Sequence, residues 1–227
     1  SVLASSHAKK PWKCSKGHMW SAKIQNRTLQ GQNCPICANR QVLSGFNDLN
    51  TKYPTIAQEA YGWDPTTVLP GSNKKVPWKC SKGHVYKSMI TSRTTKNSGC
   101  PYCSNQEVLQ DFNDLQTVYP EIAKDADGWD PKTILGKSHK KMPWICKLGH
   151  KYKSVVKSRT LQNQGCPYCA NKRVLSGFND LQTLYPKLAM EAHGWRPSTV
   201  VPGSGAKKRW QCDKGHVWDA KPSNIKQ

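Results

Sequence analysis

Apolar residues in this chain are sparse, and their clearest arrangement has helical spacing. One stripe occupies positions i, i+3, i+4 and i+7, formed by Tyr53, Ile56, Ala57 and Ala60. Such spacing places four side chains on one face of a helix. Thr51 stands near the expected N-cap, Pro54 in the first turn, and Gly62 at the expected stop. The pattern predicts one short amphipathic helix over residues 51–62.

A second pattern predicts a β-hairpin. Trp12 precedes a turn that contains Gly17, and Met19 and Trp20 follow it. Aromatic residues that flank a tight turn are typical of two short paired strands. Gly17 occupies the position where a tight knuckle requires a residue that tolerates a positive φ.

Both patterns recur with a period of 66 residues, without insertion or deletion. The helical stripe returns as Tyr119/Ile122/Ala123/Ala126 and Tyr185/Leu188/Ala189/Ala192. The period predicts about three and a half copies of one unit, with a module at 1–45 and linker-plus-module segments at 46–111, 112–177 and 178–227. Both ends fall inside a unit, which indicates either a piece of a longer array or ragged terminal repeats that act as caps.

The composition narrows the class of protein. The 227 residues carry a net charge of +21, ten cysteines and nine tryptophans but only three phenylalanines. No apolar run reaches the roughly 18 residues that span a membrane, and no signal peptide opens the chain. The tryptophans and cysteines argue against full disorder. We therefore expect a soluble α+β protein of small modules with an anionic partner.

The cysteines recur with a histidine in the order Cys-x3-His-x15-Cys-x2-Cys. The three complete sets are Cys14/His18/Cys34/Cys37, Cys80/His84/Cys100/Cys103 and Cys146/His150/Cys166/Cys169. Cys212 and His216 form a half-site, which needs two further ligands from outside this sequence. Three thiolates and one imidazole are the ligands of a closed structural zinc site. The alternatives are a disulfide framework, which would have to pair odd triplets across units, and a redox CxxC, which would leave the histidine unexplained.

Four protein ligands leave no open position for a catalytic water, so the predicted zinc is structural. The sequence shows no nucleophile–base pair, phosphate loop or carboxylate cluster, and we predict no enzymatic activity. Reduced thiolates indicate a reducing intracellular compartment rather than secretion, without specifying which one.

The recurrent order Trp-x-Cys-x-x-Gly-His-x-aromatic, Arg-Thr, Gly-Cys-Pro-Tyr-Cys and Asn-Asp-Leu-x-Thr-x-Tyr-Pro resembles a tandem-repeat zinc-ribbon family of the treble-clef group. The resemblance covers nearly the whole chain. It implies a zinc knuckle, a β-hairpin, and a helix whose first turn carries the last two ligands, with linker helices between modules. Such modules occur in bacteria, phages and large DNA viruses, and some are fused to nuclease-like domains. The resemblance thus implies nucleic-acid recognition. The first unit departs from it at Ile36, where the others have Tyr.

The positive charge is concentrated in the third unit. Residues 12–77 carry +5, residues 78–143 carry +3, and residues 144–209 carry +10. We predict phosphate contacts at basic residues of the hairpins and of the segment after the last ligand: Arg27, Arg93, Arg159, Lys147, Lys151, Lys153, Lys157, Lys172 and Arg173. Alternation on a strand would place Lys151, Lys153 and Lys157 on one face.

Several of these residues have a second interpretation. The recurrent arginine either contacts phosphate or fixes the hairpin by bonding to backbone carbonyls. Trp20, Tyr86, Tyr152 and Trp218 either stack on bases or pack on the hairpin. The Asn-Asp pairs are better explained by capping than by a nuclease site. We therefore predict a non-catalytic zinc-finger array that binds nucleic acid, with DNA favoured over RNA. The alternative is a scaffold subunit that bridges proteins in a large assembly.

Overall fold

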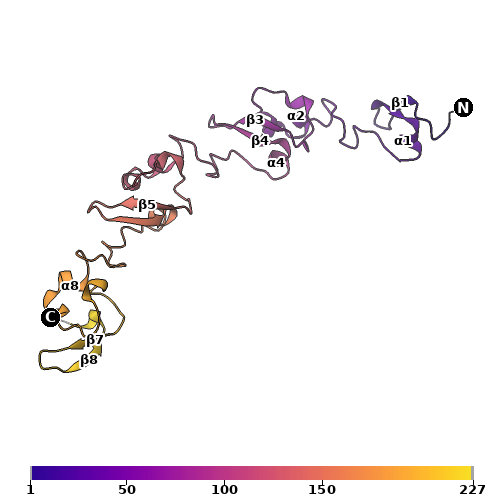
Figure 1. Cartoon of the computed structure of the whole chain (residues 1–227). Coiled ribbons are helices and arrows are strands. Elements are labelled where there is room, and N and C mark those ends of the chain that lie inside the picture. Colours follow the sequence, from indigo (N-terminus) through magenta and orange to yellow (C-terminus); the bar gives the residue numbers. More distant parts are fainter. Residues whose placement is uncertain (1, 226–227) are drawn as a thin grey trace. The chain divides into compact units, whose positions relative to one another are not determined.

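A computed structural model describes residues 2–225 and consists of small hairpins and short helical turns that repeat along the chain (Figure 1). Residues Ser1–Glu107 and Val108–Gln227 form two compact units. Each unit contains two hairpins, and each hairpin is a separate two-stranded sheet. Within residues 2–225, no helix is long and apolar enough to cross a membrane.

The predicted hairpins are present in all four repeats. Their strands are antiparallel: β1 (Lys9–Lys13) with β2 (Met19–Lys23), β3 (Lys75–Lys79) with β4 (Val85–Met89), β5 (Lys141–Ile145) with β6 (Lys151–Val155), and β7 (Lys208–Gln211) with β8 (Val217–Ala220). In each register a tryptophan faces an aromatic residue, as Trp78 faces Tyr86. Because side chains alternate across a strand, the two members of a pair share one face of the hairpin, and in the second and third hairpins both members are buried.

A short helix directly after each of the first three hairpins was not predicted. These helices are α1 (Ile24–Thr28), α4 (Ile90–Thr94) and α7 (Val156–Thr160), and the fourth hairpin is followed by the 3₁₀ turn η4 (Pro222–Asn224). Ile90 and Val156 are fully buried at the first helical position. Each helix is only five residues long, and so its sequence contains too few apolar positions to show a helical period.

The linker is two helical turns rather than the single helix predicted over residues 51–62. The segments are α2 (Leu49–Lys52), α3 (Pro54–Ala57) and the 3₁₀ turn η1 (Pro65–Thr67); α5 (Leu115–Val118), α6 (Pro120–Ala123) and η2 (Pro131–Thr133); and α8 (Leu181–Leu184), α9 (Pro186–Ala189) and η3 (Pro197–Thr199). The N-cap is Asp48, whose carboxylate accepts the N–H of Thr51 at 2.9 Å. Tyr53 leaves the helical region (φ −140°, ψ 65°), because a residue before proline is disfavoured there.

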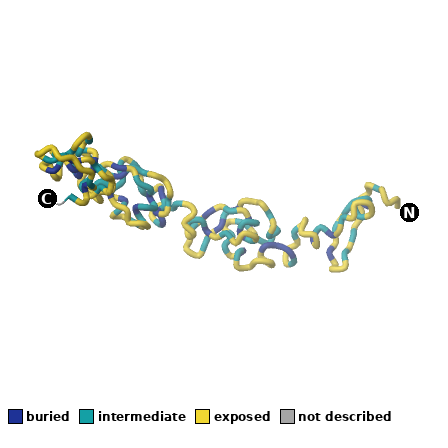
Figure 2. The backbone as a smooth tube through the Cα atoms, turned by 90° about the horizontal axis from the view of Figure 1, so that it is seen from below, coloured by how far each residue is buried: buried dark blue, intermediate teal, exposed yellow. Residues whose placement is uncertain are grey.

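The core of each repeat lies between the linker and the hairpin that follows it. Trp78, Trp144 and Trp210 are 0% exposed, and Trp63 packs edge-to-face on Trp78 with ring centroids 5.1 Å apart. The buried residues form short stretches separated by exposed ones (Figure 2). Cys80 and Cys100 pack against the cluster around Trp78. The core therefore adjoins the cysteine pairs and fixes their backbone.

Candidate metal centres and basic grooves

The first two predicted ligands of each repeat lie on a tight knuckle between the strands. Cys14 donates its N–H to the carbonyl of His18 at 3.1 Å, and Gly17 donates to the carbonyl of Cys14 at 2.9 Å. Gly17 has φ 84°, in the left-handed region that side chains disfavour. The glycine predicted from sequence is thus the residue that closes the knuckle and directs Cys14 and His18 to one side.

The last two ligands lie on a hydrogen-bonded turn, not on the helix that the resemblance implied. Ala38 donates to the carbonyl of Cys34 at 3.0 Å, and no regular helix is assigned over residues 34–38. The side chain of Asn47, buried at 2% exposure, donates to the carbonyls of Ile36 and Gln41, each at 3.0 Å. Asn47 therefore braces the ligand turn from 11 residues away. Its recurrence beside Asp48 was visible in the sequence, but capping explained the pair and this role was missed.

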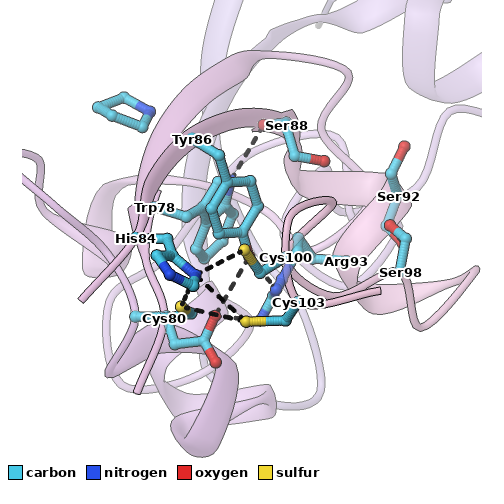
Figure 3. A network of polar contacts seen from close by, with 12 residues as sticks. Trp78, Cys80, His84, Tyr86, Ser88, Ser92, Arg93, Ser98, Cys100 and Cys103 are labelled. Atoms are coloured by element: carbon cyan, nitrogen blue, oxygen red, sulfur yellow. Dashed lines mark hydrogen bonds and ion pairs between the residues drawn. The ribbon is translucent and has the colours of Figure 1, made fainter. Parts of the chain in front are cut away.

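In each of the three complete sets, the four ligand atoms lie within 4.8 Å of one another. In the second set, shown in Figure 3, the Sγ atoms of Cys80 and Cys103 are 3.9 Å apart. The Nδ1 of His84 lies 3.5, 3.7 and 3.3 Å from the sulfurs of Cys80, Cys100 and Cys103. A zinc tetrahedron with Zn–S of about 2.3 Å and Zn–N of about 2.0 Å has edges of about 3.8 Å between sulfurs and about 3.5 Å from sulfur to nitrogen. The spacing of the donors fits zinc.

The first and third sets have the same dimensions. Their sulfur–sulfur distances, Cys14 to Cys37 and Cys146 to Cys169, are both 3.8 Å. The distances from the His Nδ1 to the sulfurs lie between 3.2 and 3.8 Å. Ile36, which departs from the family pattern, is buried at 4% exposure and leaves the first set unchanged. The chain therefore has three Cys3His zinc sites.

The thiols of a set differ in acidity in a way that favours a cation. Desolvation raises the pKa of Cys14, but hydrogen bonds from the backbone of Lys16 and His18 outweigh it, and the pKa is lowered overall. Desolvation and the neighbouring thiols Cys34 and Cys14 raise the pKa of Cys37 to about 11. The Cys14 thiolate thus forms readily, and its negative charge opposes the ionisation of Cys37. A divalent ion removes this conflict, since it stabilises all three thiolates together.

The fourth repeat has the knuckle but not a complete ligand set. Cys212 donates its N–H to the carbonyl of His216 at 3.1 Å, as in the other repeats. Within residues 2–225, no further cysteine pair accompanies these two residues. Zinc binding at Cys212 and His216 stays a prediction.

Two of the three recurrent arginines are almost fully buried and paired with carboxylates, which argues against their predicted phosphate contacts. Arg93 and Arg159 are 6% and 7% exposed. Arg93 pairs with Glu59 at 2.6 Å and lies over the rings of Trp78 and Tyr86, while Arg159 pairs with Asp125 at 2.5 Å. The partners come from the preceding linker, 34 residues away. In the structure these two arginines bind linker carboxylates, a role that neither predicted interpretation included.

Arg27 lies in the corresponding position of the first repeat but has different partners. It donates to the carbonyl of Gln32 at 2.7 Å and lies over Trp12 and Trp20. Tyr86 and Tyr152 are 4% and 6% exposed, so packing rather than base stacking explains them. Trp20 is half-buried and Trp218 is 36% exposed.

The lysines predicted to contact phosphate in the third repeat lie on different elements of the structure. Lys151 and Lys153 are exposed on either side of buried Tyr152, as alternation predicts, but Lys157 lies on α7 and not on the strand. Lys151 contacts the carboxylate of Asp127 at 3.3 Å. Lys147 is exposed at the knuckle.

Lys153, Lys172 and Arg173 line one groove of about 180 Å³ between β6 and the last-ligand turn. A groove of about 450 Å³ occupies the equivalent place in the first repeat, where its cations are Lys9, Lys23 and Arg40. We call these two sites the basic grooves. The sequence predicted the three cations of the third repeat but not those of the first, because only the folded turn brings residue 40 beside the hairpin.

The chain matches a protein family described as a probable treble clef zinc finger domain, and the match covers residues 1–40, 57–106 and 122–172. Each matched stretch contains one complete Cys–His–Cys–Cys set. No curated protein matches the chain.

Proposed function

The chain belongs to the probable treble clef zinc finger domain family, and we propose that it is a non-catalytic zinc-finger array that binds nucleic acid mainly through phosphate contacts. DNA is the first candidate and RNA the second. The observation that carries the proposal is the recurrence of a basic groove at the same place in the first and third repeats.

The role proposed for zinc is structural. In each set the chain supplies four ligands, so a tetrahedral ion has no open position for water or substrate. A bound zinc ion supplies a cross-link between the knuckle and the last-ligand turn. The chain's own residues then hold the groove, since Cys166 and Cys169 flank Pro167, which lines it beside Lys172. Plasmid nicking by the zinc-loaded protein would contradict the non-catalytic role.

The cations of the grooves are suited to phosphate. Lys172, Arg173 and Lys153 are exposed, and within residues 2–225 they have no carboxylate partner. Arg173 lies 5.8 Å from the ring centroid of Tyr168, which orders its guanidinium at the groove wall. Arginine and lysine side chains without a carboxylate partner can neutralise phosphates and displace the counterions condensed on the nucleic acid. This displacement makes binding salt-dependent and largely sequence-tolerant.

The experiment compares two charge reversals of equal size. Lys172→Glu removes a groove cation, and Lys187→Glu removes an exposed cation of α9 outside the basic grooves. Fluorescence anisotropy with duplex DNA, single-stranded DNA and RNA at two salt concentrations gives the affinity and its salt slope. With duplex DNA, we expect Lys172→Glu to reduce the magnitude of the slope of log affinity against log salt concentration by about 0.9 per lost phosphate contact. Lys187→Glu should leave this slope nearly unchanged. Absence of binding at low salt, or equal effects of both variants, would contradict the proposal.

The second repeat supports the alternative of a scaffold subunit. Gln106 and Glu107 occupy the places of Lys172 and Arg173, and this repeat has seven acidic residues against ten basic ones. This repeat keeps Lys87 in the place of Lys153 but lacks both cations of the last-ligand turn, so it is less suited to phosphate and better suited to contact protein. If the array bridges proteins in a large assembly, DNA affinity stays weak at low salt and protein cross-linking concentrates on this repeat.

A further inference from the structure

We propose that a cavity beside Tyr53 binds one unpaired nucleotide of a single strand, with the base against the tyrosine ring and the phosphate on Arg40 and Lys52. This inference rests on the proposed nucleic-acid binding and deepens it, because it names the class of strand. The cavity measures about 760 Å³ and lies between the last-ligand turn of the first repeat and the linker that follows. That volume is within the roughly 300–1,000 Å³ typical of small-molecule sites.

Hydrogen bonds join the walls of this cavity. Asn47, at the start of the linker, lines the cavity and donates to two carbonyls of the last-ligand turn, each at 3.0 Å. Leu49 donates its N–H to the carbonyl of Val68 at 2.9 Å, which ties the far wall, residues 67–72, to the same segment. The cavity therefore belongs to a single compact unit, Ser1–Glu107.

The tyrosine of each linker shows whether this space is open or filled. Tyr53, Tyr119 and Tyr185 occupy equivalent places and have nearly the same backbone, with φ −140°, −133° and −135°. Tyr119 packs against the core of its repeat, whereas Tyr53 and Tyr185 are 39% and 40% exposed. Because the backbone is the same, the three rings differ in the direction of the side chain alone.

One residue on the far wall accounts for the direction of the ring. It is Pro70 in the second repeat, Gly136 in the third and Pro202 in the fourth. A Cβ at Gly136 would lie 2.5 Å from Cε2 of Tyr119, so glycine is what allows the ring to fold against this wall. The two prolines exclude that position of the ring, and a cavity lies beside each of their tyrosines. Pro70 thus keeps the space open, with the ring of Tyr53 as one of its walls.

The cations at the rim select an anionic ligand. Arg40 and Lys52 line the cavity, both are exposed, and neither has a carboxylate partner within residues 2–225. Val118 and Leu184 take the place of Lys52 in the other two linkers, and the cavity of the fourth repeat has no charged lining residue. An aromatic ring beside two cations matches a base and its phosphate, the combination that holds single-stranded nucleic acid.

The position of Arg40 favours a strand over a free nucleotide. Arg40 lines both this cavity and the basic groove of the first hairpin. Successive phosphates of one strand can therefore lie in the groove while a base lies in the cavity. A base of duplex DNA is paired and stacked and has to leave the helix to enter, so an unpaired strand is the better ligand.

The test measures the binding of oligothymidylate, duplex DNA and free thymidine monophosphate to the full zinc-loaded chain, by fluorescence anisotropy and competition. Pro70→Gly closes the cavity, because it lets Tyr53 adopt the position of Tyr119, and it changes no charge. We expect oligothymidylate to bind at least about fivefold more weakly to this variant, the loss of one stacked base, and duplex DNA to bind as before. Pro202→Gly, the same change beside the uncharged cavity, is the matched control and should alter neither affinity.

Further variants make the test independent of the proline. Tyr53→Ala removes the ring and should weaken oligothymidylate at least about fivefold, whereas Tyr53→Trp should keep the affinity. Lys52→Val introduces the residue of the third linker and should reduce the magnitude of the salt slope for oligothymidylate by about 0.7. A zinc content of three ions per chain will confirm that each variant folds.

Two results would overturn this inference and leave the proposed function standing. One is oligothymidylate binding that keeps its salt dependence but is indifferent to both Pro70→Gly and Tyr53→Ala. The other is free thymidine monophosphate that binds as tightly as oligothymidylate, which would make the cavity a site for a free nucleotide. Absence of binding to any nucleic acid at low salt would overturn the proposed function and this inference together.

Discussion

Replacing Glu59 by glutamine removes the carboxylate that neutralises the buried guanidinium of Arg93. The two side chains are 30% and 7% exposed, and their nearest N and O atoms are 2.6 Å apart. The substitution keeps the size of the side chain and leaves a nearly buried charge without a counter-charge. We expect the linker of the second repeat to separate more readily from its hairpin.

The magnitude follows from the geometry. Two unit charges about 4 Å apart interact with about 4 kcal/mol at an effective dielectric constant of about 20. The desolvation of Arg93 and the partial exposure of Glu59 reduce the net effect, and about 2 kcal/mol is expected when one partner is removed. That energy corresponds to an opening equilibrium about 30-fold larger.

Amide exchange of Lys79 measures this opening, because its N–H is bonded to the Glu59 carbonyl. Exchange at Lys79 should be about 30-fold faster in Glu59→Gln under conditions where exchange follows the opening equilibrium. Ile145, bonded in the same way in the third repeat, is the internal reference. The matched control is Glu121→Gln, which breaks an exposed ion pair with Lys124 and should leave both amides unchanged.

One outcome would refute the assignment of Arg93 to the fold. If Glu59→Gln leaves Lys79 exchange unchanged and Arg93→Met weakens DNA binding, then the arginine is a phosphate contact as first predicted. If instead Lys79 exchange rises and DNA affinity is constant, the arginine is confirmed as a link between the linker and the hairpin.

Three further predictions concern the metal centres and the caps. Cys103→Ser should reduce the zinc content from three ions to two per chain in native mass spectrometry, and a loss of all three ions would show that the sites are not independent. Gly83→Ala should weaken zinc binding about fivefold in competition with a chromophoric chelator, because Gly83 has φ 85° and a side chain there costs about 1 kcal/mol, although its Cβ would meet no atom within 4 Å. Asp48→Ala should speed exchange of the Tyr53 amide about fivefold at neutral pH, the effect of losing an N-cap worth about 1 kcal/mol. Desolvation raises the pKa of Asp48, but hydrogen bonds from the Thr51 side chain and backbone and from the Gly45 backbone outweigh it, and the pKa is lowered overall. The cap should therefore be fully stabilising above the unfolded pKa of about 3.9, and its contribution should be lost as pH falls through the lower pKa of the folded state. A cap whose contribution is already lost at neutral pH would contradict this sign.

The sequence by itself determined the features that depend on local order. The 66-residue period gave the repeats, and the spacing of Cys and His identified all 12 ligands of the three sets. The hairpins and the positive φ at Gly17 also followed from residues a few positions apart. Such features are fixed by backbone geometry over one turn, and pattern and propensity report them directly.

The tertiary structure decided what happens between segments that are distant in sequence. Arg93 looked like a surface cation, and its carboxylate partner, 34 residues earlier, carried no signal that linked the two. Arg40 joined the groove of the first hairpin only through the fold of the last-ligand turn. Burial and ion pairing depend on which surfaces meet. The role of a charged residue therefore becomes clear only when its non-local neighbours are known.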